Sequence, residues 1–286
     1  MIATGFAIGR AALKGAAFLF VAALVVGLSG CASVDRFGGS RQAVVDWGRE
    51  RGFDANHLLL RRFRLLSLQR FDPSQPATVL NVYIEGDGAP WQTPFHPPQN
   101  PTPTEPIALA LADADPAPAV AYLGRPCQYL EAAELAACSP EYWTNLRFAP
   151  DVVTAYMGFL DRLKETSGAK RLRLFGYSGG GVLATLLAAR RGDVEQLVTV
   201  ASPLAVAEWT ALHQATPLLG SLDPSVAVTG RLPPATHFVG GRDRIVPSRL
   251  VVIFAARTGG TLNEVPDFDH QCCWSRDWRR LLEEIK

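Results

Sequence analysis

Residues 171–183 read RLRLFGYSGGGVL, a β-strand pattern that runs into a cluster of glycines and then into a helical pattern. The segment contains a Gly-x-Ser-x-Gly motif with Ser178 at its centre. A serine at such a strand-to-helix turn takes a strained backbone conformation, and the strand and helix leave almost no room for side chains two positions away on either side. Gly176 and Gly180 meet that requirement, so we predict that Ser178 is a nucleophile at the end of a strand.

Strand and helix patterns alternate on both sides of this turn. We expect strands at residues 58–71, 78–84, 119–123, 171–175, 194–201, 237–240 and 261–265. We expect helices at residues 41–51, 107–114, 150–166, 179–191 and 246–257. This alternation predicts an α/β protein with a mostly parallel, doubly wound sheet, whose functional groups lie at the carboxyl ends of the strands. Residues 202–236, between two strands, are expected to form a small cap insertion over the site.

The hydroxyl of serine is a poor nucleophile near neutral pH and needs a base that a third group holds in place. Asp243 lies in a turn after the expected strand 237–240, within the segment GGRDRIVP. His270 lies in the loop after the last expected strand. We therefore predict Asp243 as the acid and His270 as the base of a triad with Ser178.

Other residues compete for these two roles. In the alternative hypothesis Asp223 is the acid, and Asp243 is only a turn residue after two glycines. The alternative bases, which lie elsewhere in the sequence than after the last strand, are His57, His96, His213 and His237. Asp267 and Asp269 are expected to be solvated loop residues, either of which could hold nearby backbone.

From residue 58 to the C-terminus the chain resembles the α/β-hydrolase superfamily. GYSGG at 176–180 resembles its nucleophile elbow, GGRDRIVP at 240–247 resembles its acid loop, and the histidine of Asp269-His270 resembles its base. The chain order nucleophile, acid, base is also that of the superfamily. The resemblance implies that Ser178 attacks an acyl carbonyl, that His270 takes and returns the proton, and that Asp243 orients and stabilises the imidazolium.

The resemblance further implies an oxyanion hole made of two backbone N–H donors. One donor is Gly179, which follows the nucleophile. Many members carry His-Gly in the loop that supplies the other donor, whereas this chain has EGDG at 85–88. The expected donor is the N–H of Asp87, with Gly86 as the neighbouring possibility. Glu85 replaces the usual histidine, and the Asp87 carboxylate has to point away from the oxyanion or be neutralised.

The N-terminus has the features of an exported protein. A basic region with Arg10 and Lys14 precedes an uncharged apolar stretch at 15–28, which is short for a membrane span. The following LSGC resembles a bacterial lipobox, which implies diacylation of the sulfur of Cys31 and durable attachment to a membrane. The alternative is a plain signal peptide in which Cys31 is incidental.

These features predict three parts of the chain. Residues 1–30 are the lipoprotein signal peptide, 31–57 the lipid-anchored N-terminal segment and 58–286 the α/β-hydrolase domain. The protein is then expected in the cell envelope, anchored to a membrane and facing the periplasm. The residues after the anchor lack the aspartate that resembles an inner-membrane retention signal, which favours the outer membrane.

Four more cysteines would lie in this oxidising compartment, and four cysteines allow three pairings. Cys127 and Cys138 flank a short segment and are expected to form a disulfide. Cys272 and Cys273 are adjacent, either as a vicinal disulfide or as two buried thiols. The spacing of cysteines and histidines disfavours a zinc site, and we expect no metal.

The composition narrows the class of function. With 28 Lys and Arg against 27 Asp and Glu, the chain has a formal charge of +1 and no field that would attract nucleic acid. We expect a serine hydrolase that cleaves a carboxylic ester of a small-molecule acyl substrate through an acyl-enzyme, without a cofactor. The same triad serves a thioesterase, an amide hydrolase or an acyltransferase. The alternative from another class is a non-catalytic envelope lipoprotein that uses the scaffold for binding.

The proline-rich segment at 91–106 has two interpretations. It is either a rigid surface loop or part of a substrate-pocket wall that includes Trp91 and Phe95.

Overall fold

The structure is a computed structural model, and it describes Met1 and residues 39–89 and 96–285. Residues 2–30 of the predicted signal peptide, the predicted lipidation site Cys31, Trp91 and Phe95 lie outside the described residues. Within the described ranges, every helix is too short or too polar to span a bilayer.

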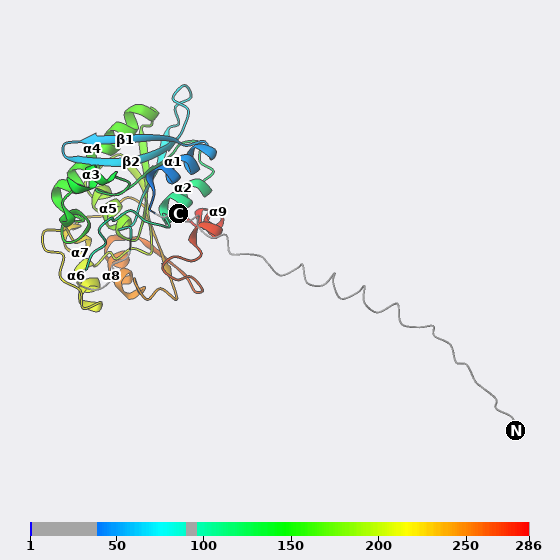
Figure 1. The fold of residues 1–286 in the computed structure, drawn as a ribbon. Helices are drawn as coiled ribbons and strands as arrows, with labels where there is room; N and C mark the ends of the chain where they lie inside the picture. The colour runs from blue at the N-terminus through cyan, green and yellow to red at the C-terminus, as the bar shows by residue number, and fades with distance from the viewer. Residues whose placement is uncertain (2–38, 90–95, 286) are drawn as a thin grey trace. The chain divides into compact units, whose positions relative to one another are not determined.

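The described residues form one eight-stranded sheet in the order β1-β2-β4-β3-β5-β6-β7-β8. Its strands are β1 (Asp54–Leu60), β2 (Phe63–Arg70), β3 (Val79–Ile84), β4 (Val120–Leu123), β5 (Arg171–Tyr177), β6 (Val194–Val200), β7 (Ala235–Gly240) and β8 (Thr261–Val265). The six strands from β3 to β8 pair in parallel, and β1 and β2 add an antiparallel edge (Figure 1). The predicted fold class, a mostly parallel α/β sheet, is confirmed.

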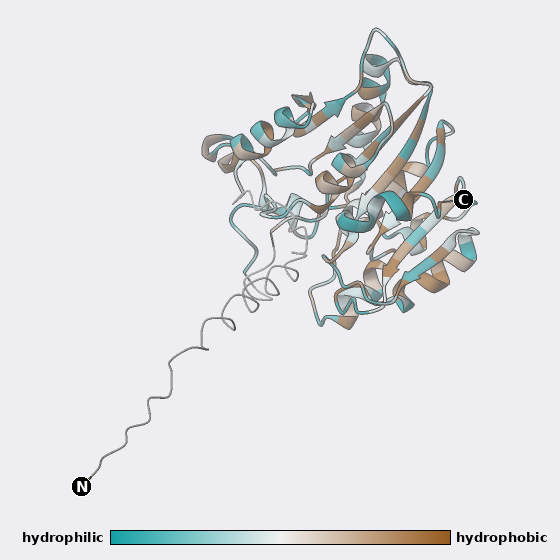
Figure 2. Ribbon diagram, turned by 90° about the vertical axis from the view of Figure 1, so that its right-hand side faces the viewer, coloured by the Kyte–Doolittle hydropathy of each residue, from teal (hydrophilic) through white to brown (hydrophobic). Residues whose placement is uncertain are grey.

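Helices cover both faces of this sheet. They are α1 (Arg41–Glu50), α2 (Ile107–Ala114), α3 (Ala132–Ala136), the 3₁₀ helix η1 (Pro140–Trp143), α4 (Pro150–Ser167), α5 (Gly179–Ala188), α6 (Val206–Leu212), α7 (Pro224–Ala227), α8 (Arg249–Thr258) and α9 (Trp274–Leu282). Helices α4, α5 and α8 contribute to one buried cluster, and α1, α2 and α9 contribute to another on the opposite face. Figure 2 shows hydrophobic residues along the central strands and along the helical stretches that pack on them.

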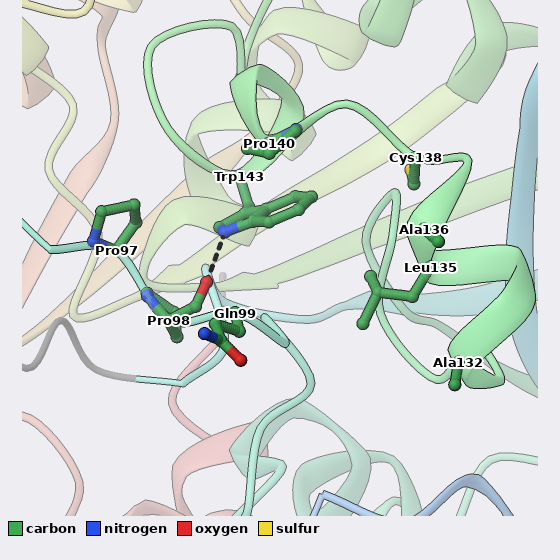
Figure 3. A pocket seen from close by; sticks show the side chains of 9 residues that line it. All are labelled: Pro97, Pro98, Gln99, Ala132, Leu135, Ala136, Cys138, Pro140 and Trp143. Atoms are coloured by element: carbon green, nitrogen blue, oxygen red, sulfur yellow. Dashed lines mark hydrogen bonds between the residues drawn. The ribbon is translucent and has the colours of Figure 1, made fainter.

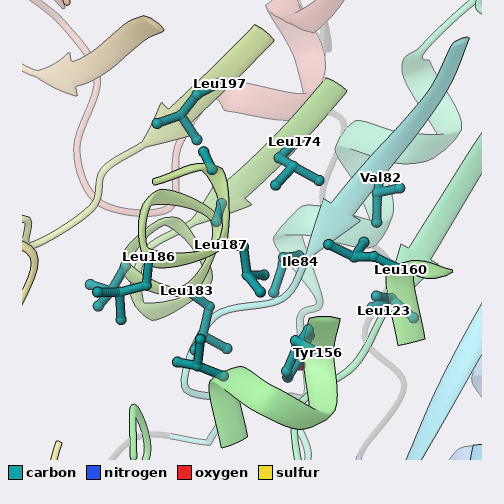
Figure 4. Close-up of a cluster of buried hydrophobic side chains, with 14 of the residues drawn as sticks. Val82, Ile84, Leu123, Tyr156, Leu160, Leu174, Leu183, Leu186, Leu187 and Leu197 are labelled. Carbon is teal, nitrogen blue, oxygen red and sulfur yellow. The ribbon is translucent and has the colours of Figure 1, made fainter. Parts of the chain in front are cut away.

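Alternating side chains of each central strand enter the two clusters, because successive residues of a strand point to opposite faces. In β3, Val82 and Ile84 pack under α4 and α5, while Tyr83 lies in the other cluster and stacks on Phe175. Figure 4 shows the first cluster, where Leu160 of α4 and the leucines of α5 surround the ends of β3 and β5. The sheet is therefore buried on both sides, as a parallel sheet requires.

The expectation of a single strand at 58–71 is wrong. The chain makes a hairpin there, in which β1 pairs with β2 from Asp54↔Gln69 to Leu60↔Phe63. Arg61 turns the chain with a φ of 54°, a left-handed conformation that is uncommon for arginine. The turn contains none of the glycine, asparagine or aspartate residues that usually mark one. Two parts of the segment that we expected before the domain belong to this structure. Helix α1 packs through Val44 into the cluster that contains α2 and α9, and Asp54–His57 of β1 pair with β2.

The predicted cap insertion contains two short helices, α6 and α7. It contacts the acid loop through Trp209, whose indole N–H donates to the carbonyl of Ile245 at 2.9 Å. It also contacts the segment after η1, because Leu222 N–H donates to the carbonyl of Phe148 at 3.0 Å. The insertion thus runs between two segments that follow the carboxyl ends of different strands.

Candidate active site

Ser178 lies in the turn between β5 and α5. Its φ of 49° and ψ of −123° are a strained combination for a residue with a side chain, as expected for a nucleophile turn. A Cβ at residue 176 would overlap the carbonyl of Gly180, and a Cβ at residue 180 would overlap the carbonyl of Ile84. Only glycine fits at these two positions, because the strand and helix approach each other so closely.

The structure brings Ser178, His270 and Asp243 into one line of hydrogen bonds. The Oγ of Ser178 lies 3.1 Å from Nε2 of His270, and Nδ1 of the same ring lies 2.9 Å from Oδ2 of Asp243. An ionised carboxylate can only accept, so Nδ1 carries the proton and donates it to Asp243. Nε2 is then the acceptor for the serine hydroxyl. This tautomer is the one that a general base requires.

The acid loop holds Asp243 with the backbone. The Asp243 side chain is fully buried, and its Oδ1 accepts from the N–H groups of Ile245 at 2.8 Å and Val246 at 2.7 Å. With Oδ1 occupied in this way, Oδ2 faces the imidazole. Asp243 therefore has a fixed orientation toward His270.

A turn after β8 positions His270. Its carbonyl accepts from the Tyr177 hydroxyl at 3.0 Å and from the Trp274 indole N–H at 3.1 Å. Oδ1 of Asp269 accepts from the N–H groups of Gln271 at 2.9 Å and Cys272 at 2.7 Å, so Asp269 holds the loop backbone. The His270 side chain is only 14% exposed. These contacts fix the loop that carries the imidazole.

The competing residues have other partners or positions. The alternative acid, Asp223, accepts from the N–H of Ser225 and caps α7. Of the alternative bases, His57 lies on the edge strand β1, His96 is exposed, His213 bonds the carbonyl of Ile245, and His237 is buried in β7. Asp267 pairs with Arg242 at the surface. None of these described side chains joins the line from Ser178 to Asp243.

The loop after β3 lies beside the nucleophile turn. Oε1 of Glu85 accepts from the Gly86 N–H at 2.8 Å, so that N–H is already engaged. The N–H groups of Asp87 and Gly179 have no acceptor among the described residues. Of the two predicted candidates in this loop, Asp87 is thus the one with an N–H left for a ligand. A side chain at residue 179 would overlap Oδ1 of Asp87, so the Asp87 carboxylate lies directly against the backbone of Gly179.

Two arginines that the sequence analysis did not identify hold the Asp87 carboxylate. Nη1 of Arg125 lies 2.9 Å from its Oδ1, and Nη1 of Arg147 lies 2.7 Å from its Oδ2. Burial by itself would raise the pKa of Asp87, but the charges and the hydrogen bonds of Arg147 and Arg125 together outweigh that effect and hold the pKa below its ordinary value. The only sign of them in the sequence was that a carboxylate at residue 87 needs neutralisation.

The cysteines form two bridges. Cys127 is joined to Cys138, and Cys272 is joined to Cys273, so the vicinal pair is a disulfide here. Cys138 also lines an open pocket of about 490 Å³, together with Pro97, Pro98, Gln99, Ala132, Leu135, Ala136, Pro140 and Trp143 (Figure 3). The indole N–H of Trp143 donates to the carbonyl of Pro98 at 2.9 Å across this pocket. No residue of the Ser178 line is among its lining residues.

Among the described residues, no group of three or more His, Cys, Asp and Glu side chains has the arrangement of a metal site. The groups described at the site are a serine, an imidazole, a carboxylate and a pair of backbone N–H groups. This set can activate a hydroxyl and stabilise a negative charge next to it.

Comparison with solved structures identifies similar folds. Est1E from Butyrivibrio proteoclasticus aligns over 80% of this chain and 98% of its own, with a TM-score of 0.54 and 14% identity. An α/β serine hydrolase homologue from Coxiella burnetii aligns over 81% and 95%, with a TM-score of 0.54 and 13% identity. Thermogutta terrifontis esterase 2, phosphoramylated by tabun, aligns over 82% and 93%, with a TM-score of 0.55 and 11% identity. These similarities show that the chain has the α/β-hydrolase fold.

No protein-family model matches the sequence, and no curated protein matches it.

Proposed function

We propose that the protein is a serine hydrolase that cleaves a carboxylic ester through an acyl-enzyme intermediate. The observation that carries the proposal is the unbroken line from Ser178 Oγ through both ring nitrogens of His270 to Asp243, with spacings of 3.1 and 2.9 Å. A serine on a strained strand-to-helix turn, with an imidazole nitrogen 3.1 Å from its hydroxyl, has little use outside nucleophilic catalysis.

The acylation half-reaction follows from this geometry. Ser178 Oγ attacks the acyl carbonyl carbon while its proton moves to Nε2 of His270, and the carbonyl electron pair moves to the oxygen. The N–H groups of Gly179 and Asp87 would donate to that oxyanion. When the intermediate collapses, the bond to the leaving group breaks and the alkoxide takes the proton from Nε2. Asp243 stabilises the imidazolium in between but keeps its own charge.

Deacylation repeats these steps with water as the nucleophile. His270 takes a proton from the water, and the second tetrahedral intermediate expels Ser178 Oγ, which recovers its proton from Nε2. An alcohol or amine in place of water would give acyl transfer by the same route. We propose water as the acceptor and an oxygen ester of a small acyl substrate as the donor. The proposal is supported by the fold that this chain shares with Thermogutta terrifontis esterase 2.

The test is covalent labelling together with turnover. Wild type should react with a fluorophosphonate probe and hydrolyse nitrophenyl esters, and an ester panel of increasing acyl length should define the acyl preference. Ser178→Ala should lose both labelling and turnover while it stays folded. Ser74→Ala, at an exposed turn, is the matched control and should keep both. A folded wild type that neither labels nor hydrolyses any ester would favour the binding-only alternative.

We also propose that Cys31 is diacylated and anchors the mature protein, residues 31–286, in the cell envelope. The support is the sequence LSGC at 28–31, directly after an apolar stretch of secretory length. Growth with a labelled fatty acid should label the wild type but not Cys31→Ser. Incorporation of the label into Cys31→Ser would refute the anchor and leave the proposal of hydrolase activity untouched.

A further inference from the structure

The loop that supplies the proposed second oxyanion donor carries a negative charge. The Asp87 carboxylate lies directly against the backbone of Gly179, whose N–H is the first proposed donor. A negative charge beside a developing oxyanion opposes its formation, and the effect is large where water is excluded. An acyl-transfer site with an unpaired carboxylate at this position would be impaired.

Arg125 and Arg147 surround that carboxylate from the interior of the protein. Their side chains are 4% and 7% exposed, whereas that of Asp87 is 28% exposed. We call Asp87, Arg125 and Arg147 the Asp87 clamp. Two cations face one anion, so the formal charge of the clamp is +1, the sign that favours an oxyanion.

The backbone fixes both guanidinium groups. Nη2 of Arg125 donates to the carbonyl of Arg147 at 2.8 Å, and Nε of Arg147 donates to the carbonyl of Thr144 at 2.7 Å. The arginines are also held by different parts of the chain, one just after β4 and the other after η1. The clamp therefore joins the loop after β3 to two other segments and limits the positions that Asp87 can take.

We propose that Arg125 and Arg147 are positioning residues for acyl transfer, which hold Asp87 so that its N–H faces the oxyanion and cancel the charge of its carboxylate. This inference rests on the proposed hydrolase function. The arginines then have two effects: they place the N–H of Asp87, and they remove the repulsion between its carboxylate and the oxyanion. The second effect is one that a purely structural ion pair would not have.

A double-mutant cycle on Asp87 and Arg147 tests the inference with the same nitrophenyl ester. Arg147→Gln should lower kcat roughly 100-fold, the scale of a lost oxyanion contact, with KM changed less than threefold. Asp87→Asn should lose less kcat than Arg147→Gln, about tenfold, because the amide keeps one acceptor oxygen for an arginine and the repulsive charge is gone. Asp87→Asn/Arg147→Gln should recover at least about tenfold over Arg147→Gln, since nothing is left for Arg147 to cancel.

Arg191 provides the matched control. Its side chain is as buried as that of Arg147, at 7% exposed, and it likewise forms ion pairs, here with Asp161 and Asp193. It lies between α5 and β6, at the opposite end of the parallel strands from Ser178. Arg191→Gln should therefore leave kcat unchanged, even where it lowers the urea midpoint.

The outcomes distinguish the two proposals. If wild type neither labels at Ser178 nor turns over, the hydrolase function fails and this inference fails with it. If wild type is active but folded Arg147→Gln keeps its kcat, or the double variant is no faster than Arg147→Gln, the role of the clamp is refuted and the hydrolase function stands. If Arg147→Gln does not fold, the double variant is compared with Asp87→Asn, in which the charge is already gone. A folded double variant with a kcat more than about 100-fold below that of Asp87→Asn refutes the inference.

Discussion

Glu85 should make the stability of this protein fall as the pH rises toward neutrality. Its carboxyl group is buried at the end of β3, where Oε1 accepts from the N–H of Gly86 at 2.8 Å and from the N–H of Ala108 at 3.4 Å. Burial raises the pKa of Glu85 from 4.5 to about 7, although hydrogen bonds from these N–H groups and from the Tyr122 hydroxyl act in the opposite direction.

The sign of the effect follows from proton linkage. Between pH 4.5 and about 7 the folded protein keeps a proton on Glu85 that the unfolded chain has released. Stability then decreases as the pH rises, because the folded state binds more protons in that window. At about 1.36 kcal/mol for each pH unit, the free energy of unfolding loses about 3 kcal/mol across the window. Above it, the contribution of this residue no longer changes.

Glu85→Gln removes the titration and keeps an oxygen for the Gly86 N–H. The free energy of unfolding of both proteins should be measured by urea denaturation with tryptophan fluorescence at pH values from 4 to 8. The difference between wild type and variant should change by about 3 kcal/mol in favour of the variant as the pH rises. The test uses only how this difference changes with pH. Burying an amide in place of the carboxyl group adds an amount that is the same at every pH.

Glu165→Gln is the control for the chemical change. The Glu165 side chain is 70% exposed on α4, so its difference from wild type should be small at every pH. Curves for wild type and Glu85→Gln that run parallel from pH 4 to 8 would refute the reasoning, because Glu85 would then titrate alike in the folded and unfolded chains.

Three further variants test other parts of the molecule. Asp243→Asn should lower kcat roughly 10³–10⁴-fold with the fold intact, because the amide favours the wrong tautomer of His270, and ester kinetics beside circular dichroism checks this. Burial lowers the pKa of His237 to about 4, so the folded state loses stability as the pH falls from 6.5 toward 4, and His237→Gln should reduce that acid loss by about 3 kcal/mol in urea titrations. Replacing Cys127 and Cys138 by alanine should lower the free energy of unfolding by about 3 kcal/mol, the entropy of a short closed loop, and an unchanged urea midpoint would contradict it.

The regular elements of the fold could be predicted because their sequence patterns are local. Helix α2 and strand β8 begin and end at the predicted residues, and β3 and β4 each differ by one residue at the start. In α2, β3 and β4 a mostly apolar run is bounded by a proline, glycine or polar residue, and β8 lies between Gly260 and Pro266. The signal therefore lay within a few residues of the element itself.

The predictions do not include the β1–β2 hairpin or helix α9, for two different reasons. The hairpin of β1 and β2 turns at Arg61, where an arginine takes a conformation that glycine or asparagine usually supplies. Helix α9 was also missed, although Trp274, Trp278 and Leu281 are spaced as one helical face and are fully buried. Here the signal was present, since a spacing of four and then three residues is helical.

In the candidate site, some residues have a local signal in the sequence and others have none. Ser178, Asp243 and His270 each follow a strand, and their order along the chain is informative by itself. Arg125 and Arg147 lie in irregular segments, and nothing near them in the sequence marks a role. Their importance comes from the distance to Asp87, a contact across 38 and 60 residues of chain. Only a folded structure can show such a contact.

Glu85 and Asp87 act on one loop in different ways. Glu85 engages the N–H of Gly86 through its own carboxyl oxygen, which leaves the next N–H, that of Asp87, for a ligand. The arginines then hold that same residue by its side chain. The two sets of contacts should therefore separate experimentally: Glu85→Gln changes how stability depends on pH, whereas Arg147→Gln changes the rate of acyl transfer. A variant of either residue that produced the effect of the other would mean that the loop is held as a single unit.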